Sequence, residues 1–126
     1  MANETQRKVL VVEDSTTMRH LLAMSVRRLG AEVFEAGDGL EALRLLSQVR
    51  FDLIFVDINM PVMDGLKLIR LVRDGTLSTH TPICVCTTED SHKAELQART
   101  LGANYFLRKP TRRQEVEAVL ADVFKT

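Results

Sequence analysis

The chain contains 126 residues, of which 45% are hydrophobic and 27% are charged, a composition typical of one globular domain. Its 17 Lys and Arg residues balance 17 Asp and Glu residues, so the basic excess of a dedicated nucleic-acid-binding protein is missing. No apolar run approaches the about 20 residues that cross a bilayer, and residues 1–8 lack the apolar core of a signal peptide. We therefore expect one cytoplasmic domain over residues 1–126, with its core at about 8–124, no output domain and no membrane insertion.

The periodic pattern begins with one short apolar run and one amphipathic helix. Val9–Val12 is entirely apolar, and we interpret it as a β-strand. From Met18 to Leu29, apolar residues recur every three or four positions, which predicts a helix with one buried face. Gly30 follows where a residue with positive φ is expected to end this helix. The candidate N-caps are the hydroxyl residues Ser15, Thr16 and Thr17.

Four more apolar runs and four more helical patterns follow in alternation. The run Phe51–Ile58 is almost continuously apolar, as expected of a central parallel strand that is buried on both faces. The other runs that we interpret as strands are Glu32–Ala36, Ile83–Thr87 and Asn104–Leu107. The predicted helices cover about Leu40–Val49, Leu66–Arg73, Asp90–Leu101 and Arg112–Phe124.

This alternation is typical of α/β proteins, in which right-handed crossovers build a parallel sheet with helices on both faces. We therefore predict a three-layer, doubly wound (βα)5 fold. Ligands of such folds bind beyond the carboxyl ends of the strands. The residues that directly follow the predicted strands are therefore the candidate functional residues.

Acidic, hydroxyl and basic side chains stand at four of these strand ends. Glu13 and Asp14 follow the first strand, Asp57 follows the third, and Lys109 follows the fifth, while Thr87 ends the fourth. Three carboxylates that share one site repel one another unless a cation lies among them. Mg²⁺ suits such a site best because it binds one or two carboxylates together with phosphate oxygens and water.

An aspartate in this setting can act as a nucleophile toward phosphorus. We therefore predict that Asp57 accepts a phosphoryl group, whose charge Lys109 and the Thr87 hydroxyl would stabilise. Each residue also has a structural interpretation: Asp14 could cap the first helix, Asp57 could start a turn, and Lys109 could be an exposed loop cation. Such explanations would have to hold at every strand end at once, which favours the functional interpretation.

Other reactive or charged features have simpler explanations. Cys84 and Cys86 lie two positions apart in an apolar run, so a strand would point both toward one face as small buried hydrophobes. The basic run Arg108–Arg113 is interpreted as a solvated helix start because the net charge is zero. The histidines are too scattered to complete a metal site with the cysteines.

The strand-end residues form an ordered set of motifs: Val11–Ser15, Val56–Pro61 with Asp64-Gly65, Thr87, and Lys109-Pro110. This set resembles the receiver domains of bacterial two-component response regulators, of the single-domain chemotaxis (CheY) type, from about Lys8 to Phe124. The resemblance implies a flavodoxin-like fold with a five-stranded parallel sheet in the order 2-1-3-4-5. It also implies a phospho-accepting switch that promotes its own phosphorylation and dephosphorylation, rather than an enzyme that turns over a substrate.

The resemblance assigns the chemistry of the site to four residues. Asp57 matches the phospho-acceptor of the family. Glu13 and Asp14 match the acidic pair that holds Mg²⁺ together with Asp57 and the backbone carbonyl of Asn59. Glu13 replaces the commoner Asp of this pair, a variation that should preserve metal binding through Asp14.

The resemblance also assigns the switch. Thr87 and Phe106 match the residues that respond to phosphorylation, and Lys109 matches the cation that pairs with the phosphoryl group through a loop with a cis Lys109-Pro110 bond. The residues at positions that tune phosphoryl hydrolysis are Asn59, Thr88 and Glu89. Thr88 replaces the Ala or Gly usual in the family, and Thr111 replaces a common Phe.

The partners that the resemblance implies are proteins. A sensor histidine kinase or a phosphotransfer protein would be the phosphodonor. A downstream target, such as a motor switch component, would bind the surface of the fourth helix, fifth strand and fifth helix. We expect a monomer, with a weak dimer through that surface as the alternative, and no nucleic-acid partner.

Three rival functions share parts of this pattern. A haloacid dehalogenase-type phosphatase needs a second Asp two residues after its nucleophile, where this chain has Asn59. A flavodoxin needs a phosphate-binding loop after the first strand, where the acidic pair Glu13-Asp14 stands without a Gly-rich loop. A phosphorylation-independent interaction module with a vestigial acidic pocket is the third alternative.

Overall fold

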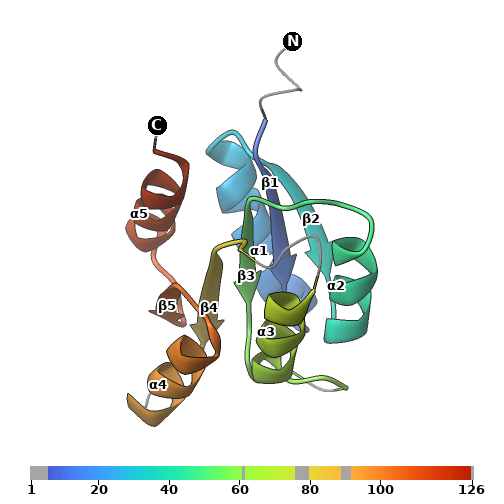
Figure 1. Ribbon diagram of the computed structural model, residues 1–126. Helices are drawn as coiled ribbons and strands as arrows, with labels where there is room; N and C mark the ends of the chain where they lie inside the picture. The colour runs from blue at the N-terminus through green and yellow to red at the C-terminus, as the bar shows by residue number, and fades with distance from the viewer. Residues whose placement is uncertain (1–5, 61, 76–79, 89–91, 126) are drawn as a thin grey trace.

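Five parallel strands form one sheet with helices on both of its faces in the computed structural model of the chain (Figure 1). The structure describes residues 6–60, 62–75, 80–88 and 92–125. The strands are β1 (Lys8–Val12), β2 (Glu32–Ala36), β3 (Leu53–Val56), β4 (Ile83–Thr87) and β5 (Tyr105–Arg108). The helices are α1 (Thr16–Arg28), α2 (Gly39–Leu46), α3 (Gly65–Asp74), α4 (His92–Leu101) and α5 (Arg113–Phe124).

The strand order is β2-β1-β3-β4-β5, and every neighbouring pair is parallel. The predicted doubly wound fold and the order implied by the family resemblance are therefore confirmed. Within the described residues, no helix is both long and apolar enough to span a bilayer.

The predicted strand at Phe51–Ile58 is longer than the observed β3. Pairing in the sheet covers only Leu53–Val56, although Phe51 and Ile58 are both buried against the core. Residues that are buried beyond the paired segment are apolar like those within it. Sequence periodicity therefore does not show where backbone pairing ends. For the same reason the predicted second helix ran beyond Leu46, where α2 ends. The predicted start of the fourth helix at Asp90 lies outside the described residues.

Side-chain caps set where three of the helices begin. The Ser15 hydroxyl accepts a hydrogen bond from the Met18 amide at 3.3 Å and caps α1, so the interpretation of Asp14 as the cap was wrong. Asp38 and Asp64 cap α2 and α3 in the same way. Gly30 has a φ of 99°, as predicted for the residue that ends the first helix.

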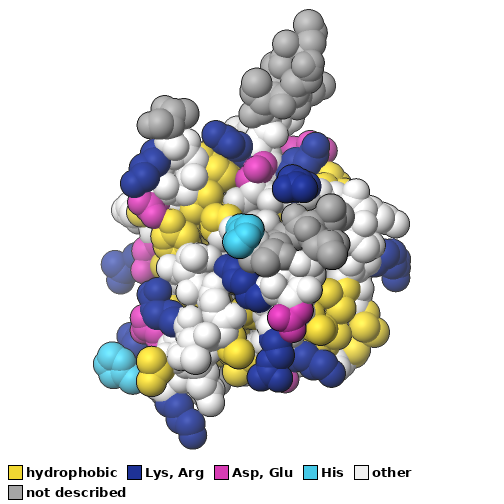
Figure 2. Space-filling view, in the orientation of Figure 1, with side chains coloured by type: hydrophobic (Ala, Val, Ile, Leu, Met, Phe, Trp, Pro, Cys, Tyr) yellow, Lys and Arg dark blue, Asp and Glu magenta, His cyan; other side chains and the backbone are white. Residues whose placement is uncertain are grey.

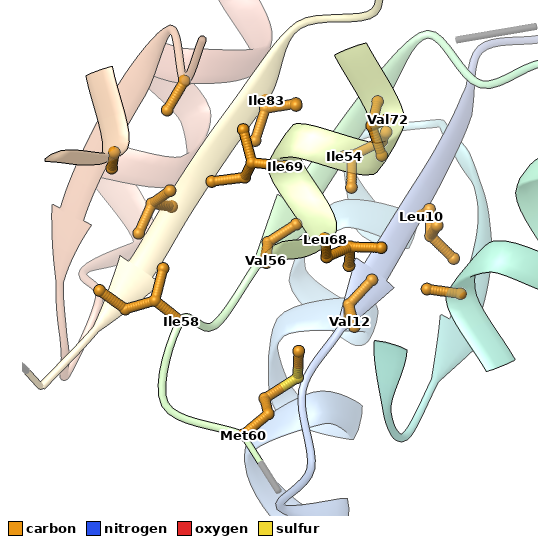
Figure 3. Close-up of a cluster of buried hydrophobic side chains, with 14 of the residues drawn as sticks. Leu10, Val12, Ile54, Val56, Ile58, Met60, Leu68, Ile69, Val72 and Ile83 are labelled. Carbon is orange, nitrogen blue, oxygen red and sulfur yellow. The ribbon is translucent and has the colours of Figure 1, made fainter. Parts of the chain in front are cut away.

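Two apolar clusters, one on each face of the sheet, hold the layers together. On one face α2, α3 and α4 cover β-strand side chains such as Ile54 and Val56, and Figure 3 shows Leu68 and Ile69 of α3 packed over them. On the other face the cluster joins the strands to α1 and α5. Its members include Cys84 and Cys86, which are buried and free, so their predicted role as small hydrophobes in a strand is confirmed.

The N-terminus of α3 lies unusually close to the end of β3. A Cβ atom at Gly65 would stand 2.5 Å from the Asp57 carbonyl oxygen and 2.5 Å from the Ile58 Cα. Both obstacles are backbone atoms, which cannot move aside as a flexible side chain can. Gly65 therefore allows α3 to begin directly behind the strand end that carries Asp57.

A hydrogen bond also joins β5 to α5. The Tyr105 hydroxyl donates to the carboxylate of Asp122. This bond, together with burial and the negative charge of Asp122, raises the pKa of Tyr105 to about 12. Tyr105 is the only tyrosine of the chain, so its titration reports on this contact alone.

We expect Gly65→Ala to lower the free energy of unfolding by about 1–3 kcal/mol, because the added methyl group overpacks against backbone. Urea denaturation measures the change. Gly37→Ala is the matched control, since its Cβ would meet only the flexible side-chain ends of Arg19, at 3.3 Å, and Glu41, at 3.8 Å. Equal losses in the two variants would contradict the close approach at Gly65.

We expect the ultraviolet absorbance of the phenolate to titrate with a midpoint of about 12 in the folded chain and closer to 10 in Asp122→Asn. The folded chain holds this proton more tightly than the unfolded chain. Stability therefore falls as the pH rises from about 10 to about 12, where only the unfolded chain releases the proton. A native midpoint near 10 would show that the contact with Asp122 does not form.

Candidate functional site

The register between β1 and β3 brings three carboxylates together at the carboxyl edge of the sheet. Val12 pairs with Val56, and the Asp57 amide donates to the Val12 carbonyl at 3.1 Å. Glu13 and Asp14 therefore leave β1 beside Asp57. Carboxylate oxygens of the three residues all lie within 4.8 Å of one another.

Two of these carboxylates are buried and contact a lysine, whereas the third is exposed. Glu13 and Asp57 are buried, with exposed fractions of 5% and 6%, whereas Asp14 is exposed. The Lys109 ammonium contacts Glu13 and lies 3.1 Å from Asp57 Oδ2. Burial alone would lower the pKa of Lys109, but the hydrogen bonds to the two carboxylates outweigh it and raise the pKa above its usual value. Lys109 is therefore charged at neutral pH.

Both buried carboxylates are oriented by further donors. The Ser15 amide donates to Glu13 Oε2 at 3.0 Å, while Lys109 contacts the other oxygen of Glu13. The Asn59 amide donates to Asp57 Oδ1 at 3.0 Å. Each carboxylate oxygen can accept about two hydrogen bonds, so Asp57 still has lone pairs for a further ligand.

Arg19 is a site residue that the sequence analysis missed. Its guanidinium donates to the backbone carbonyl of Glu13 at 2.9 Å and to Glu35 of β2 at 3.2 Å. It thereby fixes the loop that carries the acidic pair to the neighbouring strand. The only signal in the sequence is a cation one turn into the first helix, which is too common to indicate such a role.

The hydroxyl of Thr87 reaches the same network from β4. Thr87 is fully buried, and its Oγ1 accepts a hydrogen bond from the Asn59 side-chain amide at 3.1 Å. The Lys109 amide in turn donates to the Thr87 carbonyl at 2.8 Å. Asn59 therefore connects Asp57 to Thr87, through its backbone on one side and its side chain on the other.

Phe106 lies on the same face of the sheet as Thr87. It pairs with Val85, and alternation along β4 places Val85 and Thr87 on one face, so Phe106 and Thr87 are diagonal neighbours. Phe106 is partly buried against the cluster beneath α3 and α4. The remaining predicted residues are less informative: Thr88 is exposed, and Glu89 lies outside the described residues.

The donor set fits a divalent cation with a preference for oxygen ligands. Three carboxylates face one ammonium, which leaves a formal charge of 1 − 3 = −2 in the cluster. Asp14 is exposed and could meet an incoming ion without losing a hydrogen bond or an ion pair to any residue that the structure describes, while Asp57 is held in place by its donors. Mg²⁺ matches this arrangement because it uses few carboxylates and retains water. The Lys109-Pro110 peptide bond is cis, as the family resemblance implies.

We expect Mg²⁺ to stabilise the folded chain, because it relieves the repulsion among the carboxylates. At a Mg²⁺ concentration of 100 times Kd the gain in the free energy of unfolding should be about 2.7 kcal/mol, and EDTA should reverse it. Thermal denaturation measures the effect. Asp14→Asn should reduce it, whereas the control Glu32→Gln, at the far end of β2, should not. An equal Mg²⁺ response in both variants would place the metal elsewhere.

Comparison with known proteins points to one family. The response regulator receiver domain matches residues 9–121. The chain is 34% identical to the chemotaxis protein CheY of Pseudomonas aeruginosa, over 94% of this chain and 96% of that protein. It is 37% identical to a CheY homolog of Campylobacter jejuni, over 94% and 93%. It is also 30% identical to the protein PilG of Pseudomonas aeruginosa, over 86% and 81%.

Solved structures agree with this assignment. The chemotaxis protein CheY4 of Vibrio cholerae superimposes with a TM-score of 0.90 at 36% identity, over 95% of this chain and all of that one. The receiver domain of a Pseudomonas aeruginosa sensor histidine kinase, solved with a magnesium ion coordinated in its active-site cleft, gives a TM-score of 0.88 at 27% identity, over 97% and 100%. The sequence match, the sheet order and the acidic cluster at the carboxyl edge together show that the chain belongs to the response regulator receiver family.

Proposed function

We propose that the protein is a response regulator that Asp57 switches by accepting a phosphoryl group from a histidine kinase or a phosphotransfer protein. The observation that carries the proposal is the position of Asp57, which is buried between two further carboxylates and a charged lysine at the carboxyl edge of the sheet. A purely structural aspartate would not need two additional carboxylates within 4.8 Å.

The residues around Asp57 suit phosphoryl transfer. An Asp57 oxygen would form the new P–O bond as the bond between phosphorus and the donor imidazole breaks, and the electron pair of that bond leaves with the imidazole. Mg²⁺, held by Asp14, Asp57, Glu13 and the Asn59 carbonyl, would neutralise charge on the phosphoryl oxygens. Lys109 is already bonded to Asp57 Oδ2 and would pair with a second oxygen.

Phosphorylation would then change the contacts of Thr87. Its hydroxyl now accepts from the Asn59 amide and would instead bond the phosphoryl group, which carries about −1.5 to −2 charges at neutral pH. The space beside Thr87 would become available to Phe106, its diagonal neighbour. This exchange would re-pack the surface of α4, β5 and α5, on which we propose that a downstream protein binds.

The names of the relatives support an output in motility. Several of them are chemotaxis proteins, which favours a target such as a motor switch component.

We also propose that Asn59, Thr88 and Glu89 set the lifetime of the phosphoryl group. Asn59 carries this idea, because its polar side chain borders the acceptor and could help to orient an attacking water.

We expect intact-protein mass spectrometry to show a gain of one phosphoryl group after exposure to acetyl phosphate with Mg²⁺. The gain should be absent with EDTA and in Asp57→Asn, and present in the control Asp74→Asn, which changes an exposed carboxylate at the end of α3. The same measurement over time gives the phosphoryl lifetime, which should lengthen in Asn59→Ala because the side chain that would orient the attacking water is removed.

No gain under any condition, with the fold intact by circular dichroism, would overturn the proposal. The acidic pocket would then be vestigial, and the protein would act as a phosphorylation-independent interaction module. An unchanged lifetime in Asn59→Ala would remove Asn59 from the residues that control hydrolysis.

A further inference from the structure

A groove runs between α3 and α4 on the face of the molecule shown in Figure 2. It has a volume of about 650 Å³ and lies away from the acidic cluster. We call it the α3–α4 groove. It is lined by Asp64, Leu66, Lys67, Arg70, Leu71 and, from α4, Leu96, Gln97, Thr100 and Leu101.

The apolar part of this groove is built from leucines. Leu66, Leu71 and Leu101 are partly buried, whereas Leu96 is 68% exposed on α4. An exposed leucine beside partly buried ones forms a continuous apolar surface, which water covers at a cost in free energy. A partner that packed on Leu96 would remove that surface from water.

The rim of the groove is positively charged. Lys67 and Arg70 on α3 line the groove and are exposed, the exposed Lys93 of α4 lines a smaller hollow beside it, and Figure 2 shows Lys and Arg side chains over these helices. Within the part of the chain that the structure describes, none of these three cations forms an ion pair. Among the described residues that line the groove, Asp64 is the one acidic residue, and one of its carboxylate oxygens caps α3 by accepting a hydrogen bond from the Lys67 amide.

We propose that the α3–α4 groove binds an acidic segment of a partner protein, whose apolar side chains pack on the leucines while its carboxylates pair with the rim cations. Charge complementarity favours an acidic occupant: Lys67 and Arg70 stand beside the leucines of the groove and Lys93 beside the adjoining hollow, and none of the three pairs with a carboxylate among the described residues. Among the described residues that line the groove, none is aromatic and could stack on a nucleic-acid base, so a protein segment fits it better.

The groove continues toward the acceptor site. A smaller hollow of about 380 Å³ shares Asp64, Leu66 and Gln97 with it and is also lined by Ile58 and Asn59. Asn59 is the residue that hydrogen-bonds both Asp57 and Thr87. Binding in the groove should therefore depend on whether Asp57 is phosphorylated. This dependence, unlike binding itself, rests on the proposed function.

Fluorescence anisotropy with three labelled peptides tests whether the groove prefers an acidic segment that contains leucine. The first places Glu and Leu residues at helical spacing, the second replaces each Glu by Lys, and the third replaces each Leu by Ser. We expect the native chain to bind the first peptide most tightly, with an affinity that falls as salt rises. Amide shifts in NMR spectra should locate it at α3 and α4, for example at Leu96 and Thr100. Equal binding of the acidic and basic peptides, or shifts on α1 and α5, would overturn the proposal.

Variants of the groove and matched controls test whether its cations and its exposed leucine bind the peptide. Lys67→Glu combined with Arg70→Glu should weaken the acidic peptide about tenfold and favour the basic one, because rim charges act mainly through electrostatic attraction. Leu96→Ser should weaken all peptides that contain Leu. Arg28→Glu and Leu21→Ser are the matched controls, since both change exposed residues of α1 on the opposite face of the sheet. Equal effects in variants and controls would contradict the assignment.

Two further measurements separate the remaining explanations. If sedimentation shows a dimer that Lys67→Glu with Arg70→Glu dissociates, the groove is occupied by a second copy of the chain and the proposal fails. The affinity for the acidic peptide is measured first on the native chain without acetyl phosphate, so a failure of phosphorylation leaves the groove testable. A change in that affinity after treatment of the native chain with acetyl phosphate and Mg²⁺, absent in Asp57→Asn, would support the coupling through Asn59.

Discussion

The ion pairs of Lys109 with Glu13 and Asp57 join residues that are 96 and 52 positions apart in the sequence. Two carboxylates buried to this degree are costly to remove from water unless a charged partner satisfies them. Lys109 supplies that partner from the end of β5, at the same edge of the sheet, and its own burial is compensated in turn by the carboxylates. The site depends on this arrangement because the negative cluster would otherwise favour opening the edge of the sheet where its chemistry takes place.

The rest of the fold holds these three residues within contact distance. The parallel register of β1 and β3 places the acidic pair beside Asp57, and Gly65 lets α3 begin immediately behind it. The apolar clusters on the two faces of the sheet anchor the strands. A rigid sheet with a polar edge is therefore well suited to a switch, since a change of charge at one carboxylate is not absorbed by the core.

Asn59 stands at the centre of the proposed coupling. Its backbone amide orients the acceptor, its side chain holds the Thr87 hydroxyl, and its surface lines the hollow that leads to the α3–α4 groove. Under the two proposals, a change at Asp57 would have two routes outward. One passes through Thr87 toward β5, and the other passes toward the leucines and cations of α3 and α4. The second route uses no residue of α5, so two protein surfaces could respond to the same event.

The sequence alone determined the alternation of strands and helices, and from it the edge of the sheet at which Glu13, Asp14, Asp57, Thr87 and Lys109 would meet. It did so because burial imposes a readable period on each element and because parallel strands all end at one edge. The ends of the elements were less predictable: Phe51 and Ile58 are buried without pairing, so their apolarity extended the predicted strand beyond β3.

Only the tertiary structure decided the contacts between distant parts of the chain. The anchoring of the loop at Glu13 to Glu35 of β2 by Arg19 and the groove between α3 and α4 depend on how side chains meet across elements. These contacts follow from the packing of helices on the sheet, which no local pattern encodes. Lys67, Arg70 and Lys93 appear in the sequence as ordinary exposed cations, and packing alone brings the first two to the α3–α4 groove and the third to the hollow beside it.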